Sequence, residues 1–127
     1  MPTDHPTDRQ RRAQILIVDD DPSFRSSARI LLAVRGYQVV GEADCGEEGL
    51  ALASAIRPDA VLLDVNLPDG DGLAMAARLT AAGGPRVLLT SSDPTVAPDD
   101  LIRTSGAVGF VAKENLADAA LDTYLTG

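Results

Sequence analysis

Side chains that could carry phosphoryl chemistry stand where the apolar runs of this sequence end. Asp64 follows the apolar residues 61–63, where another apolar side chain would be expected, and a loop rich in Asn, Pro, Asp and Gly comes next. Aspartates 19–21, the hydroxyl residues 90–92 and Lys113 follow three more such runs. An aspartate can act as a nucleophile and form an acyl phosphate, while carboxylates and phosphate oxygens hold Mg²⁺. Because a hydroxyl and an ammonium can bind phosphoryl oxygens, this set favours phosphoryl transfer to a carboxylate.

These residues need a frame that brings the ends of separate strands together. The chain alternates short apolar runs, typical of strands covered on both faces, with segments typical of helices. The predicted strands lie within residues 14–21, 37–43, 59–64, 86–92 and 108–113, and the predicted helices within residues 21–36, 44–58, 71–84, 97–107 and 114–125. This alternation implies an α/β fold, a doubly wound five-stranded parallel sheet with helices on both faces. Ligands of such sheets bind outside the carboxyl ends of the strands, where the polar residues lie.

Two helix starts carry capping signals. Asp21 can cap the helix at 21–36, because Pro22 suits its first turn. Asp44 and Glu47 stand at the spacing of a capping box for the helix at 44–58.

Composition narrows the classes of function. The 127 residues suit one domain, and 45% apolar residues predict a packed globule. A net charge of −8 argues against direct nucleic acid binding by this chain. Cys45 and His5 are the only residues of their types, so an internal disulfide is excluded and histidine catalysis is disfavoured. We predict a disordered tail at residues 1–13, one domain at 14–127, no membrane span and a cytoplasmic location.

Other interpretations of Asp64 fit less well. It could only start a turn, but a turn needs no hydroxyl or lysine on neighbouring strands. A calcium loop is rejected because Pro68 takes the third ligand position, Asp69 replaces the required glycine and Met75 replaces the closing glutamate. A phosphatase of the haloacid dehalogenase type would need a second acid where this chain has Asn66.

Purely structural interpretations remain open for four other residues. Asp21 is more simply a helix cap than a third metal ligand. Thr90 could be an ordinary β-branched strand residue, and Phe110 could be core packing. Lys113 could be a solvated lysine at a strand end, although the preceding stretch "GAVGF" favours a functional role.

Residues 15–125 resemble the receiver domain of bacterial two-component response regulators. The stretches "ILIVDDD", "VLLDVNLPDGDG", "VLLTSS" and "GAVGFVAK" carry the resemblance in order and spacing. The resemblance implies the flavodoxin-like strand order 2-1-3-4-5. Many receivers place a proline in a cis bond after the lysine, whereas Glu114 follows here, so we expect a trans bond.

The resemblance also implies roles at the site. Asp64 corresponds to the phosphoacceptor and Lys113 to the lysine that binds the phosphoryl group. Thr90 is similar to the switch hydroxyl, Ser91 to the small residue beside it and Phe110 to the switch aromatic. Mg²⁺ or Mn²⁺ would be the cofactor, held by the residues Asp19 (largely through water), Asp20 (directly), Asp64 and Asn66 (through its backbone carbonyl). Asn66 and Ser92 would tune self-catalysed dephosphorylation.

The function implied is a phosphorylation switch. A histidine kinase or histidine phosphotransfer protein would present phosphohistidine to Asp64, and the face formed by residues 97–125 would change its affinity for an unknown downstream protein or for a second copy of the chain. The leading hypothesis is a single-domain regulator. Two alternatives stay open: the receiver of a helix-turn-helix transcription regulator, and a phosphorylation-independent adaptor.

Overall fold

The computed structural model describes residues 12–81, 83–93, 95 and 98–126 of the chain. Most of the predicted tail at residues 1–13 lies outside this part. Arg12 and Ala13 are described, and the Ala13 carbonyl accepts a hydrogen bond from the backbone of Gln38. None of the described helices is long and apolar enough to cross a membrane.

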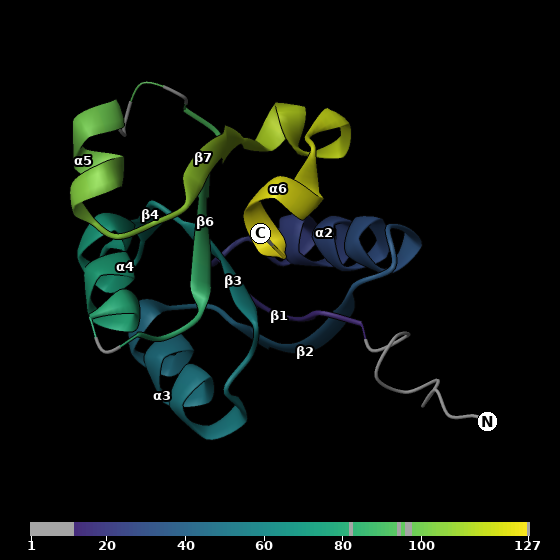
Figure 1. Cartoon of the computed structure of the whole chain (residues 1–127), viewed down its shortest axis with the longest axis horizontal. Helices are drawn as coiled ribbons and strands as arrows, with labels where there is room; N and C mark the ends of the chain where they lie inside the picture. Colours follow the sequence, from purple (N-terminus) through teal and green to yellow (C-terminus); the bar gives the residue numbers. More distant parts are fainter. Residues whose placement is uncertain (1–11, 82, 94, 96–97, 127) are drawn as a thin grey trace.

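Five parallel strands form the central sheet (Figure 1). They are β1 (Gln14–Val18), β2 (Gln38–Ala43), β3 (Ala60–Asp64), β6 (Arg86–Ser91) and β7 (Gly109–Ala112). Their spatial order is β2-β1-β3-β6-β7, which confirms the expected order 2-1-3-4-5. A small antiparallel hairpin, β4 (Asn66–Leu67) with β5 (Gly70–Asp71), follows β3. The sequence indicated only a loop there.

Helices cover both faces of the sheet, as predicted. The helices α3 (Gly46–Ile56), α4 (Gly72–Thr80) and α5 (Asp99–Thr104) lie on one face (Figure 1). The other face carries α2 (Pro22–Val34), the 3₁₀-helix η1 (Lys113–Asp118) and α6 (Leu121–Leu125). Every peptide bond of the described residues is trans, including the one between Lys113 and Glu114.

Two aliphatic cores follow from the alternation of side chains along the strands. In β1, Ile15 and Ile17 face α2 and α6, whereas Leu16 and Val18 face α3 and α4. The strands β3 and β6 repeat this division, and residues 60–65 are all buried. The alternation of side chains in the buried strands therefore sets the direction of the residues just beyond their ends.

The helix caps match the prediction at α2 but not at α3. Asp21 accepts a hydrogen bond from the backbone N–H of Ser23, so the cap of α2 is confirmed. The capping box of Asp44 and Glu47 is wrong, because Cys45 takes the N-cap position of α3 without a side-chain cap. The first backbone N–H groups of α3 donate instead to Asp69, which lies between β4 and β5.

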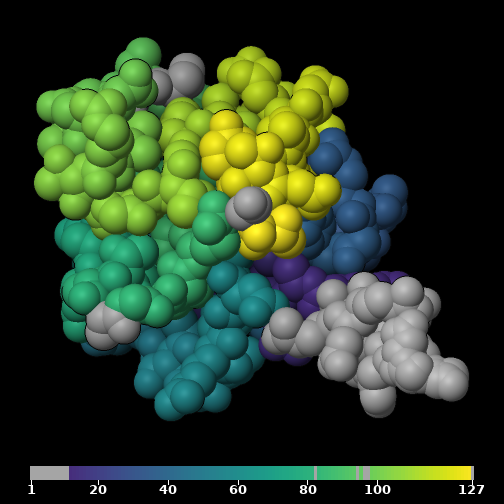
Figure 2. All heavy atoms as spheres, viewed as in Figure 1, coloured from purple at the N-terminus to yellow at the C-terminus, as the bar shows by residue number. Residues whose placement is uncertain are grey.

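The final segment also differs from the prediction. The single helix expected at 114–125 is divided into η1 and α6, with extended backbone at Ala119 between them. Arg35 donates to carbonyls of the segment at Ala117 and Ala119, and the Tyr37 hydroxyl donates to Asp122. Figure 2 shows this segment, in yellow, packed between the blue residues of α2 and the green residues that precede it. Hydrogen bonds from the distant side chains of Arg35 and Tyr37 thus accompany the break in the helix between η1 and α6.

Candidate phosphoacceptor site

Four polar side chains reach the same face of the sheet because each follows a residue of one core by two positions. Asp19, Asp64, Thr90 and Lys113 come two residues after Ile17, Leu62, Leu88 and Val111, which all belong to the core under α2 and α6. Alternation therefore directs all four toward α2, at the carboxyl ends of the strands. Asp64 and Thr90 are also register partners in β3 and β6.

Lys113 lies at the centre of this group. Its Nζ is 2.8 Å from Asp19 Oδ2 and 3.5 Å from Asp64 Oδ2. The ammonium also lies over the ring of Phe24 in α2, 4.3 Å from the ring centroid. Lys113 is the only lysine of the chain, since the other side-chain cations are arginines. The one side-chain amine of the sequence thus contacts two buried carboxylates and an aromatic face.

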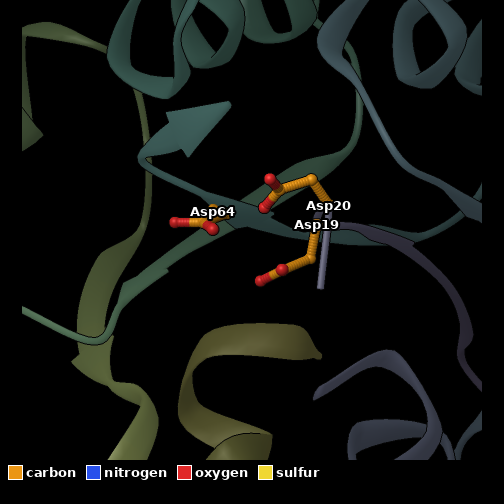
Figure 3. Close-up of side chains that lie close together, drawn as sticks. All are labelled: Asp19, Asp20 and Asp64. Atoms are coloured by element: carbon orange, nitrogen blue, oxygen red, sulfur yellow. The ribbon is translucent and has the colours of Figure 1, made fainter. Parts of the chain in front are cut away.

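Three carboxylates gather beside the lysine. Ligand oxygens of Asp19, Asp20 and Asp64 all lie within 4.8 Å of one another, and Figure 3 shows the three side chains together at the ends of their strands. Asp19 is fully buried and Asp20 is exposed. Asp19 Oδ2 receives no hydrogen bond from the described residues and has only its ion pair with Lys113. Three clustered carboxylates fit a divalent cation of the Mg²⁺ class.

The environment of Asp64 opposes its negative charge. Its side chain is almost fully buried, and one oxygen accepts a hydrogen bond of 3.0 Å from the backbone N–H of Asn66. Burial raises the pKa of Asp64, and the neighbouring charge of Asp19 adds to this, against the opposing effects of the Asn66 N–H and Lys113. A cation bound at the site would offset the cost of burying the Asp64 charge and its repulsion by Asp19.

Burial and the neighbouring carboxylates have opposite effects on the pKa of Lys113, and the effect of the carboxylates is larger. Burial by itself would lower the pKa of the ammonium. The contact with Asp19 and the charges of Asp19 and Asp64 outweigh that effect, so the pKa of Lys113 is raised. The amine is therefore protonated at neutral pH and can bind an anionic group.

The hydroxyls after β6 are buried and bonded. Thr90 is fully buried, and its Oγ1 donates a hydrogen bond of 2.7 Å to the carbonyl of Val111 in β7. Ser91 is equally buried, and its Oγ accepts a hydrogen bond of 3.1 Å from the backbone N–H of Asp93. Thr90 thus lies beside Asp64 in register, while its hydroxyl is bonded to the edge strand.

Phe110 lies away from the acids. It is half-buried and packs against the core under α3, α4 and α5. It also lines a cavity of about 490 Å³ with Tyr124 of α6. The structure therefore brings Asp19, Asp20, Asp64 and Lys113 into one cluster and places Phe110 in a separate layer.

Sequence reasoning missed contacts made by Phe24, Arg25 and Asp69. Arg25 donates 2.6 Å from Nη1 to the carbonyl of Asp19, and its Nε bonds Glu42 at the end of β2. An aromatic and an arginine in the first turns of a helix that follows an acidic strand end were the available signals.

Comparisons with known proteins agree with this geometry. The family model described as the response regulator receiver domain matches residues 15–125. BvgA of Bordetella pertussis, named as a regulator of virulence-factor transcription, is 42% identical over 105 residues, which cover 81% of this chain and 50% of BvgA. The response regulator GacA of Pseudomonas aeruginosa is 37% identical over 103 residues, covering 79% of this chain and 48% of GacA.

The solved structures give the same result. The signal receiver domain of NarL from Mycobacterium tuberculosis has a TM-score of 0.77 and 35% identity, over 84% of this chain and 88% of that domain. The chain spans about half the length of BvgA and of GacA. Together with the strand order and the acidic cluster, these matches show that the chain belongs to the family of response regulator receiver domains.

Proposed function

We propose that Asp64 accepts a phosphoryl group from a phosphohistidine of a histidine kinase or histidine phosphotransfer protein. The observation that carries this proposal is that Lys113 contacts both Asp64 and Asp19, which form the acidic cluster together with Asp20. One carboxylate oxygen of Asp64 forms the bond to phosphorus while the phosphorus–nitrogen bond breaks. The ammonium of Lys113 then binds a phosphoryl oxygen.

Asp20, Asp64 and the backbone carbonyl of Asn66 would hold Mg²⁺ or Mn²⁺, and Asp19 would act largely through water. A divalent cation there supplies charge that offsets the repulsion between the carboxylate and the phosphoryl group. The fit rests on the three carboxylates, whose ligand oxygens lie within 4.8 Å of one another.

Phosphorylation would act as a switch through Thr90 and Phe110. The phosphoryl group adds roughly −1.5 to −2 charge and strong acceptors. The Thr90 hydroxyl would leave Val111 and bond this group, which gives Phe110 room to move inward, while Ser91 keeps the place beside it small. The population then shifts between two states of the surface formed by α5, β7, η1 and α6. A downstream protein or a second copy of the chain would bind one of these states more tightly.

The relatives favour a second candidate for the whole protein. The transcription regulator BvgA and the response regulator GacA are each about twice as long as the matched region. The receiver would then control an attached helix-turn-helix output domain, and reading the frame downstream of Gly127 distinguishes this from a single-domain regulator.

Phosphorylation with a small phosphodonor and Mg²⁺ tests the proposal. We expect intact mass to show one added phosphate on the wild type and none on Asp64→Asn. Asp93→Asn is the matched control, because Asp93 is an exposed aspartate beyond β6 and should leave phosphorylation unchanged. A wild type that gains no phosphate from several donors and shows no response to beryllofluoride refutes the proposal and favours the phosphorylation-independent adaptor.

A further inference from the structure

The tip of the hairpin β4–β5 is fastened to a helix on the far side of the loop. Asp69 Oδ1 accepts a hydrogen bond of 2.8 Å from the backbone N–H of Gly46, and Asp69 Oδ2 accepts one of 2.9 Å from that of Glu47. One carboxylate thus binds the first two N–H groups of α3, and these bonds lower the pKa of Asp69. We propose that Asp69 is a positioning residue that holds the Asn66 carbonyl where the metal needs it. This inference rests on the proposed function.

The base of the same hairpin is fastened to the acceptor strand. The Asn66 N–H donates to the Asp64 carboxylate, and the Gly72 N–H donates 2.7 Å to the carbonyl of Val65. A Cβ at Gly72 would lie 2.2 Å from the Asp64 carbonyl oxygen, so only glycine permits this approach. The hairpin is therefore tied at its base to β3 and at its tip to α3.

The helix that receives Asp69 is itself closely packed against the site. A Cβ at Gly49 would lie 2.8 Å from a methyl of Val18, the last residue of β1 before Asp19. A Cβ at Gly46 would lie 2.4 Å from Met75 of α4. The helix α3 packs closely against both β1 and α4. Asp69 is therefore bonded to a helix whose position relative to β1, and so to Asp19 and Asp20, is set by this packing.

Without Asp69 the hairpin keeps the bonds at its base and the buried side chain of Leu67, but its tip loses both bonds to α3. Its ladder has two residue pairs, Asn66 with Asp71 and Leu67 with Gly70. A two-stranded hairpin this small is marginal by itself, and residues 68–71 are exposed. A metal that binds the Asn66 carbonyl would then have to order the hairpin as it binds, which weakens its affinity.

Mg²⁺ titration of the full chain by calorimetry tests this role. Loss of partners that orient metal ligands commonly weakens metal affinity about 10- to 100-fold. Since Asp69 acts through the backbone, we expect the lower end, roughly a tenfold rise in the Mg²⁺ dissociation constant for Asp69→Ala, and a smaller rise for Asp69→Asn, which keeps one acceptor oxygen. Asp71→Ala is the matched control. It removes the same charge from the same hairpin and also removes a helix cap, the 2.8 Å bond from Leu73 N to Asp71.

The two variants separate positioning from charge and stability. Urea unfolding should show similar losses for both, because each loses a helix cap. Amide hydrogen exchange without metal should be faster at Asn66 in Asp69→Ala than in Asp71→Ala. Equal dissociation constants for the two alanine variants, or unchanged exchange at Asn66, overturn the role of Asp69 while leaving the site intact. A wild type that binds no Mg²⁺ overturns the proposed function and this inference together.

Discussion

If the Thr90 hydroxyl binds the phosphoryl group, it must first break its hydrogen bond to the Val111 carbonyl, and the energies of the two bonds predict the effect on affinity. Thr90 Oγ1 donates 2.7 Å to the Val111 carbonyl in a fully buried position. A neutral hydrogen bond contributes about 0.5–1.5 kcal/mol, whereas one to a charged group contributes about 1.5–3 kcal/mol. Exchanging the first for the second favours the phosphoryl-bound state by about 1.2 kcal/mol, which is roughly eightfold in affinity.

Thr90→Val removes the hydroxyl with little change in volume. We expect about 1 kcal/mol less free energy of unfolding in urea, since the Val111 carbonyl loses a partner. We also expect roughly eightfold weaker binding of beryllofluoride in the presence of Mg²⁺, followed by ¹⁹F NMR. Thr90→Ser keeps the hydroxyl and should stay within about twofold of the wild type in beryllofluoride affinity. Equal beryllofluoride affinity for Thr90→Val and the wild type refutes the transfer of this hydrogen bond.

Two further predictions concern the contacts around α2. Burial first, and then the bond to Asp122, raise the pKa of Tyr37 from 10.0 to about 12, so the folded state keeps this proton after the unfolded chain has lost it. Stability from Tyr37 is therefore present below pH 10 and lost as pH rises toward 12. The advantage of the wild type over Tyr37→Phe in urea should shrink by up to about 2.7 kcal/mol across that range, and a constant difference contradicts this. For Phe24, a double-mutant cycle of Phe24→Leu with Lys113→Met should give a coupling of about 0.5–1 kcal/mol in urea unfolding, and no coupling rules out stabilisation by the ring.

The sequence could predict the sheet and the cluster because both depend on local patterns. Short apolar runs alternate with helical segments, and that alternation suffices for a doubly wound sheet. Once the strands are parallel, Asp19, Asp64 and Lys113 must meet at one edge, since their distances from the buried core residues follow from the pleat. The residues that the sequence placed together at the site are those fixed by strand periodicity.

What the sequence could not predict depends on contacts between distant residues. The stretch at 114–125 has good helix formers, yet Arg35 and Tyr37 bond its carbonyl and carboxylate groups and divide it into η1 and α6. The cap of α3 comes from Asp69, more than twenty residues away, instead of from Asp44. Local propensity gives no information on which of several nearby acids reaches a helix N-terminus.

Because Lys113 is the only lysine of the sequence, it has a consequence for chemical labelling. Guanidinium groups stay protonated at any pH at which the protein is handled, and they are poor nucleophiles toward reagents that attack primary amines. The only side-chain amine of the chain is held against Asp19 and Asp64. Coupling the protein to a sensor surface or a dye through lysine would therefore modify the group that we propose to bind the phosphoryl oxygen. Immobilisation through an added tag keeps the site available for measurement.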